Sequence, residues 1–277
     1  MMPRMDAPER DPGQGSQSVV PGHLDLSTPS VARMYDYYLG GKDNLPVDRE
    51  CAEEVIRKTP HVRLMARSNR DFLGRAVRFL AGECGITQFL DIETGLPTQS
   101  NVHQVAQEIN PRARVVYVDN DPLVLAHARA LLADNPNTHA MAGDLREPLH
   151  ILGDPHVRGV LIFGEPVAVL LCAVLHFIRD SEDPYGIVDT FIRAMAPGSY
   201  LLVSHAEQRR ALMPARAAYD RANAPAVLRT LVEIASFFYG LRLVEPGVVY
   251  VPLWRPDGPV YTDDLRVPVL GGIGRKP

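Results

Sequence analysis

The sequence is short of lysine, cysteine and clustered positive charge, and each shortage excludes a class of protein. Only three of the 29 lysine and arginine residues are lysines, and the formal net charge of the 277-residue chain is −4. Because no basic stripe follows the chain, we expect no binding to nucleic acid. The three cysteines, Cys51, Cys84 and Cys172, are too widely spaced for a disulfide framework or a zinc site, a pattern typical of a reducing cytoplasm.

Long apolar runs are missing as well. The most apolar stretch, residues 159–178, is interrupted by Gly164, Glu165 and Pro166, so it predicts two buried segments rather than a membrane span. Residues 1–25 are rich in proline, glycine, serine and charge, and they contain no apolar segment of the secretory type. We therefore expect a disordered tail over residues 1–25, a cytoplasmic protein and no membrane partner.

The hydrophobic content is 46%, which is enough for a sizeable core. Residues 26–85 have a helical pattern, with helices predicted over 31–39, 47–58 and 62–81. A pair of glycines, Gly40 and Gly41, ends the first of these helices. We predict that residues 26–85 form an N-terminal helical lid.

From residue 86 the pattern changes to alternating strands and helices. Strands are predicted at 88–92, 113–121, 138–144 and 199–206. Residues 167–178 are predicted to begin as a strand and to continue as a helix. Helices are predicted between the strands and at 208–223 and 225–239, and a closing hairpin is predicted from 241–247 and 248–254. Because the strands are apolar on both faces, we expect an α/β domain over residues 86–277, with a mostly parallel sheet covered by helices on both sides.

Three aspartates follow successive predicted strands, at the edge where such a sheet binds its ligand: Asp91, Asp119 and Asp144. A carboxylate after the second strand can accept hydrogen bonds from ribose hydroxyls. One after the third strand can accept from an adenine amino group, with the backbone N–H of Leu145 beside it. Gly95 lets the backbone pass close to a nucleoside. We interpret the group as a nucleoside site, with simple capping of the following helices as the alternative.

Four segments together resemble one family of bacterial proteins: PSVARMYDYYLGGKDNLPVDRE, GLPTQSNVHQVAQ, YVDNDPLVLAHARALL and VAVLLCAVLHFI. On these motifs, residues 26–277 resemble a chiefly actinobacterial, mostly uncharacterised family of S-adenosyl methyltransferases. Residues 88–255 are similar to the wider class I S-adenosylmethionine-dependent methyltransferases. The resemblance implies a three-layer, Rossmann-like fold whose seven-stranded, mostly parallel sheet has an antiparallel last strand.

The same resemblance implies S-adenosylmethionine as the cofactor and carries binding roles onto matching positions of this chain. The residues that it places around the cofactor are Asp91, Gly95 and Thr98 on the methionine and ribose side, Asp119 at the ribose, and Asn120, Asp144 and Leu145 at the adenine.

Position 93 departs from the family pattern, which has glycine where this chain has Glu93. An inward carboxylate would repel the cofactor's own carboxylate by about 1 kcal/mol in water and by more when desolvated. Its β-carbon would also strain a backbone conformation that glycine allows. Alternatively, Glu93 turns outward or pairs with an arginine such as Arg70. We include Glu93 among the residues of the cofactor site.

Methyl transfer requires an aligned acceptor, and it requires a general base only when the acceptor must lose a proton. The candidate catalytic residues are Tyr35 and Tyr38 on one face of the first helix, and His176 and His205 after the fourth and fifth strands. Tyr37 and Asn44 are candidate substrate or lid residues. As the alternative, the tyrosines dock the lid onto the core and the histidines are hydrogen-bonded structural residues.

These features favour methyl transfer from S-adenosylmethionine to an unidentified small-molecule acceptor. The alternative is a non-catalytic, nucleoside-binding or regulatory protein on the same scaffold, which Glu93 and the lack of an unambiguous base suggest. A nucleotide-dependent oxidoreductase ranks third because the G-x-G-x-x-G fingerprint is incomplete.

The histidines are not grouped as metal ligands, so we predict no metal. Residues 271–277 are expected either to fold over the ligand site, with Arg275 in contact with an anion, or to form a frayed end. The oligomeric state is not indicated.

Overall fold

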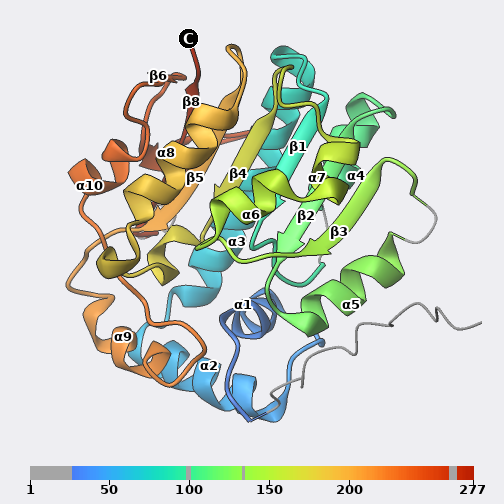
Figure 1. Ribbon diagram of the computed structural model, residues 1–277. Coiled ribbons are helices and arrows are strands. Elements are labelled where there is room, and N and C mark those ends of the chain that lie inside the picture. Colours follow the sequence, from blue (N-terminus) through green and yellow to red (C-terminus); the bar gives the residue numbers. More distant parts are fainter. Residues whose placement is uncertain (1–26, 98–100, 133–134, 262–266) are drawn as a thin grey trace, which may run out of the picture.

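The structure is a computed structural model that describes residues 27–97, 101–132, 135–261 and 267–277. One β-sheet lies between two layers of helices, and further helices cover one end of it (Figure 1). The strands are β1 (Gln88–Ile92), β2 (Arg114–Asp119), β3 (Thr138–Ala142), β4 (Ala168–Cys172), β5 (Tyr200–Ala206), β6 (Arg242–Leu243), β7 (Val249–Tyr250) and β8 (Val269–Arg275).

The helices follow the strands in the alternating order that the sequence predicts. They are α1 (Val31–Leu39), α2 (Pro46–Lys58), α3 (Val62–Arg78), α4 (Val102–Ile109), α5 (Pro122–Leu131), α6 (Pro148–Gly153), α7 (Pro155–Val160), α8 (Pro184–Ala194), α9 (Met213–Tyr219) and α10 (Leu231–Ser236). Short turns of 3₁₀ or π geometry occur at Phe79–Glu83, Leu175–Phe177, Asp180–Glu182 and Val251–Leu253.

Within the described residues the sheet has eight strands in the order β3-β2-β1-β4-β5-β8-β6, with β7 also paired to β8. The first five strands are parallel, and β8 is antiparallel to β5. The predicted α/β class and the mostly parallel sheet are therefore confirmed. The sheet has eight strands instead of seven because two short strands, β6 and β7, both pair with β8.

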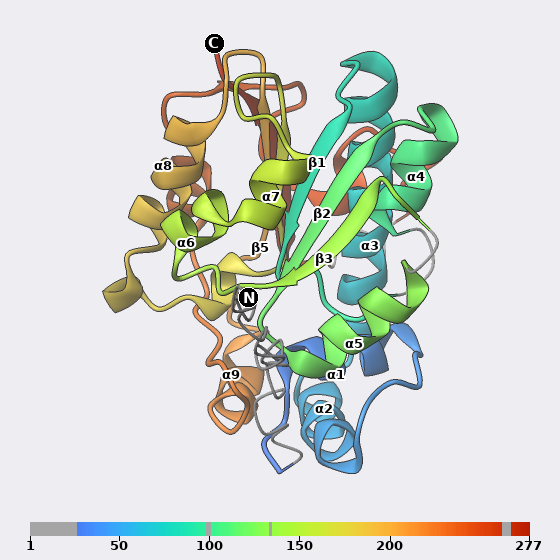
Figure 2. The same cartoon turned by 45° about the vertical axis from the view of Figure 1, so that its right-hand side comes forward.

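The central strands are buried on both faces, as expected for a parallel sheet between helices. Alternate residues of one strand therefore belong to different cores. Phe89 packs with the cluster that contains α3 and α4, and Leu90 packs with the cluster that contains α6, α7 and α8. Figure 2 shows these two helical layers on opposite sides of β1, β2 and β3.

The antiparallel strand lies elsewhere in the chain than the sequence predicts. The expected hairpin of 241–247 and 248–254 contributes only the two-residue strands β6 and β7. Residues 271–277 are predicted to be a flap or a frayed end, but residues 269–275 form β8 in the interior of the sheet. In Figure 1 the C-terminus lies at the opposite end of the sheet from α1, α2 and α9, so the prediction of Arg275 over the ligand site was wrong.

Close packing explains why this glycine-rich segment is a strand. A β-carbon on Gly271 would lie 2.8 Å from the ring of Phe72, and one on Gly274 would lie 2.9 Å from Leu241. Glycine is therefore needed where Phe72 of α3 and Leu241, which directly precedes β6, pack against β8. Glycine-rich sequence normally indicates a turn or a loose end, which is why the sequence alone misplaces this strand.

Three other segments also differ from the predictions. The helix predicted at 208–223 shrinks to α9, which begins next to Pro214 because proline fits only the first helical turn. The helix predicted at 225–239 shrinks to α10, which begins where Thr230 caps the backbone N–H of Glu233. After β4 the chain makes a single 3₁₀ turn at Leu175–Phe177 instead of a long helix.

The N-terminal helices lie in two different places. α1 and α2 pack with α9 across the carboxyl ends of the strands, around Met34, Val55 and Ala218. α3 packs on the face of the sheet beside α4. The division into a tail, a lid over 26–85 and a domain over 86–277 stays a prediction.

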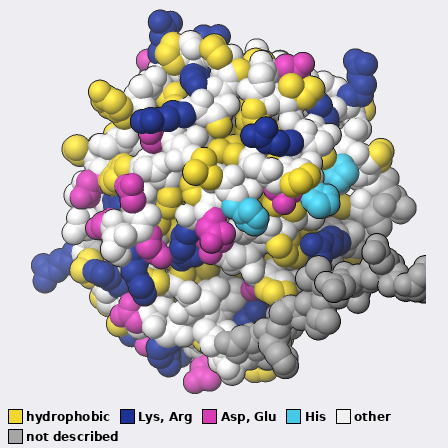
Figure 3. Space-filling view, viewed as in Figure 1, with side chains coloured by type: hydrophobic (Ala, Val, Ile, Leu, Met, Phe, Trp, Pro, Cys, Tyr) yellow, Lys and Arg dark blue, Asp and Glu magenta, His cyan; other side chains and the backbone are white. Residues whose placement is uncertain are grey.

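The exterior carries both signs of charge. On the face drawn in Figure 3, acidic and basic side chains are interspersed with apolar ones. Among the helices of the described segments, none is long and apolar enough to cross a membrane.

Candidate functional site

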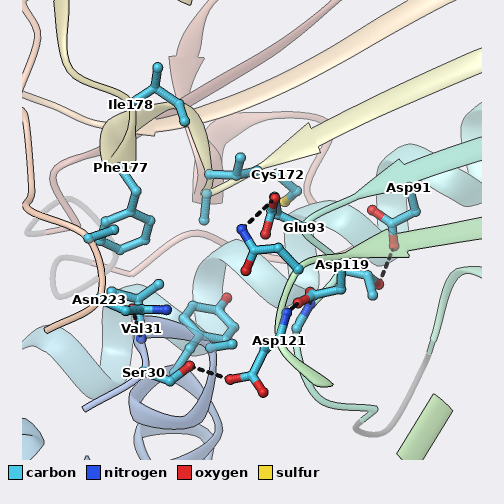
Figure 4. Close-up of a pocket in the computed structure, with 18 of the residues that line it drawn as sticks. Ser30, Val31, Asp91, Glu93, Asp119, Asp121, Cys172, Phe177, Ile178 and Asn223 are labelled. Carbon is cyan, nitrogen blue, oxygen red and sulfur yellow. Dashed lines mark hydrogen bonds between the residues drawn. The ribbon is translucent and has the colours of Figure 1, made fainter. Parts of the chain in front are cut away.

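A cavity opens at the carboxyl ends of β1, β2 and β4, beside α1 and the middle of α3 (Figure 4). We call it the strand-end cavity. Its empty volume is about 940 Å³, part of which is open to solvent. Its lining includes Ser30, Tyr35, Asn69, Arg70, Asp91, Glu93, Thr94, Gly95, Asp119, Asn120, Arg146, Cys172, Ala173, Phe177 and Asn223. The predicted residues after β1 and β2 therefore meet in one place.

Asp119 ends β2 and is fixed by backbone donors. Its Oδ2 accepts a hydrogen bond of 2.9 Å from the N–H of Gly95, and its Oδ1 accepts one of 2.9 Å from the N–H of Asp121. Gly95 has a φ of +69°, a conformation that favours glycine. Burial raises the pKa of Asp119 to about 7 despite these donors. The carboxyl group is held rigidly at the position where a ribose would need an acceptor.

Asp91 and Arg70 supply opposite charges to another part of the cavity. Asp91 is buried and accepts a hydrogen bond of 2.8 Å from Thr94 Oγ1, and burial raises the pKa of Asp91 to about 6. Arg70 donates through one terminal nitrogen to Asn101 Oδ1 at 2.9 Å, while its buried Nε has no partner among the described residues. An unpartnered buried N–H is costly, and Arg70 itself is one of the residues that line the cavity.

Glu93 projects into the cavity, and in Figure 4 its side chain lies between Asp119 and Phe177. Its Oε1 accepts hydrogen bonds from Asn120 Nδ2 at 3.1 Å and from the backbone N–H of Leu145 at 3.2 Å. Its φ is +54°, a strained value for a residue with a β-carbon. Burial, reinforced by the neighbouring Asp119, holds the pKa of Glu93 well above its ordinary range. The alternatives of an outward side chain or an Arg70 pair do not occur.

The third strand end is already occupied by internal contacts. Leu145 donates its N–H to Glu93, and Asp144 pairs with Arg146 at 3.2 Å. Arg146 also pairs with Glu182 at 2.7 Å. Arg146 lines the strand-end cavity, whereas Asp144 and Leu145 are not among its lining residues. Arg146 and Glu93 therefore already engage the two groups that the sequence predicts for an adenine edge.

Of the candidate catalytic residues, the structure brings Tyr35, Tyr38 and His176 near the site. Tyr35 lines the strand-end cavity, where its hydroxyl donates to the carbonyl of Ala66 at 3.0 Å and accepts from Asn69 Nδ2 at 3.0 Å. Tyr38 and His176 line a second cavity beside it. Burial raises the pKa of both tyrosines and lowers the pKa of His176 to about 3, so all three side chains are neutral at neutral pH.

Other predicted residues lie away from the cavity. Tyr37 donates to Glu53 at 2.6 Å on the outer side of α1. Asn44 is buried and donates to Asp36 Oδ2 at 2.7 Å, which fixes the loop after α1. His205 is fully buried between the carbonyl of Ala206 and the guanidinium of Arg229. Thr98 lies outside the described residues.

Several residues that the fold brings to the cavity have no binding role predicted from the sequence. Asn69 and Arg70 project from α3, Ser30 precedes α1, and Asn223 lies in the loop after α9, where it accepts from the N–H of Val31 at 2.9 Å. Polar residues within predicted helices and loops carry no local signal of a ligand, so only the tertiary packing identifies them. Among the described residues, no group of three His, Cys, Asp or Glu side chains is close enough to hold a metal ion.

The fold and the strand-end cavity define the class of protein, which is a Rossmann-like methyltransferase scaffold. Comparison of sequences then gives the family: the model of the S-adenosyl methyltransferase family matches residues 17–277, and the chain belongs to that family. S-adenosylmethionine is the cofactor of this family. Among curated proteins, none matches the chain.

Solved structures agree with this assignment. A candidate methyltransferase from Thermobifida fusca is 44% identical, with a TM-score of 0.87 over 94% of this chain and 99% of that one. A DUF574 family protein from Streptomyces avermitilis is 41% identical, with a TM-score of 0.88 over 92% of this chain and all of that one. Mitomycin 7-O-methyltransferase, at 20% identity and a TM-score of 0.51 over 84% of this chain and 58% of that one, shares the fold.

The cavity offers suitable groups to two of the three parts of S-adenosylmethionine, namely the ribose and the methionine end. Asp119 is placed for the ribose hydroxyls, while Asp91 and the unpartnered Nε of Arg70 match the ammonium and carboxylate groups of a methionine. The adenine part does not fit, because the Glu93 carboxyl group takes the Leu145 N–H. Binding of adenine there requires the Glu93 side chain to leave this position.

Proposed function

We propose that this protein transfers a methyl group from S-adenosylmethionine to a small-molecule acceptor. The observation that carries the proposal is the convergence of Asp91, Asp119 and the unpartnered Arg70 Nε on one strand-end cavity. Membership of the S-adenosyl methyltransferase family supports the same activity. The formal net charge of −4 favours a small molecule over a nucleic acid. The antiparallel β8 argues against an oxidoreductase.

The chain would contribute alignment and exclusion of water. The cofactor supplies an electrophilic methyl group on a sulfonium sulfur, which keeps the bonding electron pair when the methyl group moves to the acceptor. Asp119 orients the ribose, Arg70 and Asp91 orient the amino-acid end, and Tyr35 with Asn69 forms a fixed neutral wall beside them. His176, whose pKa is lowered to about 3, is a weak base, so an acceptor that loses a proton releases it to solvent.

The decisive experiment measures binding of S-adenosylhomocysteine by calorimetry to the wild-type chain and to Glu93→Gly and Glu93→Ala. Both substitutions free the Leu145 N–H, and Glu93→Gly also relieves the left-handed backbone. We expect Glu93→Gly to bind at least about tenfold more tightly than the wild type, and Glu93→Ala to show part of this gain.

Asp183→Gly is the matched control for backbone strain. Asp183 has a φ of +52° but caps α8, outside the cavity, so its substitution should leave the affinity for S-adenosylhomocysteine unchanged. If the wild type binds S-adenosylhomocysteine and Arg70→Met does not, the result supports the proposed function. Failure of the wild type and of both Glu93 variants to bind at millimolar concentration overturns it.

A second candidate function is a non-catalytic ligand-binding or regulatory protein. The specific observation in its favour is the hydrogen bond from Leu145 to Glu93, which fills the adenine position from within the chain. Tight binding by Glu93→Gly together with no binding by the wild type would select this second function. Methyl transfer by the wild type would exclude it.

A further inference from the structure

A second cavity adjoins the strand-end cavity under α1, α2 and α9, and we call it the Thr59 cavity. Its empty volume is about 790 Å³, part of which is open to solvent. The residues that line both cavities, which form a shared wall, are Val31, Tyr35, Asn69, Ala173 and Phe177. A molecule in the Thr59 cavity would therefore lie directly beside a molecule in the strand-end cavity.

The shared wall is held in place by internal contacts. Ala173 has a φ of +59° although it carries a β-carbon, and its N–H donates to Ser204 Oγ at 2.9 Å. Ser204 in turn donates to Asn69 Oδ1 at 2.6 Å, and Asn69 donates to Tyr35. Strained backbone that surrounding bonds maintain is concentrated at functional sites. The contacts extend from the end of β4 through β5 and α3 to α1, which fixes the place where the two cavities meet.

The remaining lining of the Thr59 cavity is mostly apolar. It includes Val55, Val62, Met65, Ala66, Leu212, Ala215, Ala226, Leu228 and Val269. Among the described lining residues the only charged side chain is that of Arg216, which is exposed on α9. Such a surface favours an apolar occupant, because burying apolar area against it is favourable and burying an unpaired charge is not.

Thr59 supplies a polar group that the fold does not use. The residue is 6% exposed and its Oγ1 has no hydrogen-bond partner within the described part of the chain. Its backbone groups are satisfied, because its N–H donates to Val55 and its carbonyl accepts from Val62. Buried hydroxyl groups are normally hydrogen-bonded, so this one indicates a partner that a ligand provides.

The other polar side chains of the cavity are paired or neutral. The hydroxyl groups of Tyr38 and Tyr219 lie 3.2 Å apart, and burial raises the pKa of Tyr219 to about 12. His176 accepts a long hydrogen bond of 3.5 Å from the N–H of Ala206. A charged ligand would therefore find no opposite charge in the buried part of this lining.

We propose that the Thr59 cavity binds the methyl acceptor, and that the acceptor is an uncharged, mostly apolar compound with a hydroxyl or carbonyl oxygen that hydrogen-bonds to Thr59 Oγ1. This inference rests on the proposed function. Thr59 is not part of the shared wall, so the oxygen that it binds is distinct from the atom that receives the methyl group. The acceptor thus has two polar positions, one at Thr59 and one beside Tyr35.

The test uses 2-naphthol as an uncharged, apolar ring compound with one hydroxyl group, titrated by fluorescence against the full chain without cofactor. We expect Thr59→Val to weaken binding about fivefold or more, since it removes one hydrogen bond and keeps the side-chain shape. Thr59→Ser, which keeps the hydroxyl group, should bind within about twofold of the wild type. Thr190→Val is the matched control, because Thr190 lies on α8 and bonds to Gly186.

Three results would overturn the inference: no binding of 2-naphthol by the wild type up to its solubility limit, equal binding by Thr59→Val, or binding of 2-naphthoate as tight as that of 2-naphthol. Because the titration contains no cofactor, it is independent of the S-adenosylhomocysteine experiment. Binding of S-adenosylhomocysteine without binding of 2-naphthol would leave the proposed function standing and remove only the acceptor assignment.

Discussion

Three buried or partly buried carboxyl groups, those of Asp91, Glu93 and Asp119, face one cavity. Burial raises the pKa of Asp91 to about 6 and that of Asp119 to about 7, and it raises the pKa of Glu93 as well. The folded chain therefore binds protons more tightly than the unfolded chain at these sites. For Asp91 and Asp119 the favourable contribution to the free energy of unfolding is complete below about pH 4 and is lost as the pH rises through about 6 and about 7, respectively. For Glu93 it is lost at a pH well above the ordinary pKa of a glutamate.

At the residue scale, this predicts that Glu93→Gln stabilises the protein at high pH. Glutamine keeps the size and the two accepted hydrogen bonds of Glu93 but carries no charge next to Asp119. We expect the free energy of unfolding in urea to rise by roughly 1–2 kcal/mol at pH 8 and to change little at pH 4. Glu50→Gln, at an exposed position of α2, is the control. An equal rise in the free energy of unfolding at pH 4 and pH 8 would contradict the prediction.

At the scale of elements, Arg33 connects α1 to α2 and α5. Its Nε lies 2.8 Å from Asp48 at the start of α2, and its Nη1 lies 3.1 Å from Asp121, which caps α5. All three side chains are buried, and Ser30 adds a hydrogen bond of 2.8 Å to Asp121. The position of α1 over the cavity therefore depends on a buried ion-pair network.

We expect Arg33→Met to lower the free energy of unfolding by about 3–5 kcal/mol, because it leaves two buried carboxylates without their partner. Chemical denaturation at pH 7 measures this. Arg63→Met is the matched control, since the Arg63–Glu53 pair is 41% and 42% exposed and should contribute less than about 1 kcal/mol. If both substitutions lower the free energy of unfolding by the same small amount, the network does not hold α1 in place.

At the scale of the whole molecule, β8 brings the C-terminal segment of the chain into the sheet. It pairs with β5 from Tyr200 to Ala206 and also carries β6 and β7. Its removal would expose the edge of β5 and the apolar side chains that pack on Ile273.

A chain that ends at residue 268 should therefore lose cooperative thermal unfolding, as measured by circular dichroism and calorimetry. A chain that ends at Arg275 retains β8 and lacks the bonds from Lys276 Nζ to the carbonyls at the end of α8, so it should fold with reduced stability. Cooperative unfolding of the shorter chain would show that β8 is dispensable.

The sequence by itself determined the α/β class, the five parallel strands and the acidic residues at the ends of β1 and β2. These features depend on hydrophobic periodicity and on the order of elements, which are local properties of the chain. The family motifs added the cofactor, and they identified position 93 as a departure from the pattern.

Only the tertiary structure decided which distant segments meet. It placed the glycine-rich residues 269–275 inside the sheet, because Phe72 and Leu241 leave no room for larger side chains there. It directed Glu93 onto the N–H of Leu145, and it left the buried Arg70 Nε and Thr59 Oγ1 without hydrogen-bond partners among the described residues. Whether a polar atom is satisfied depends on side chains far away in the sequence, so no local pattern can reveal it.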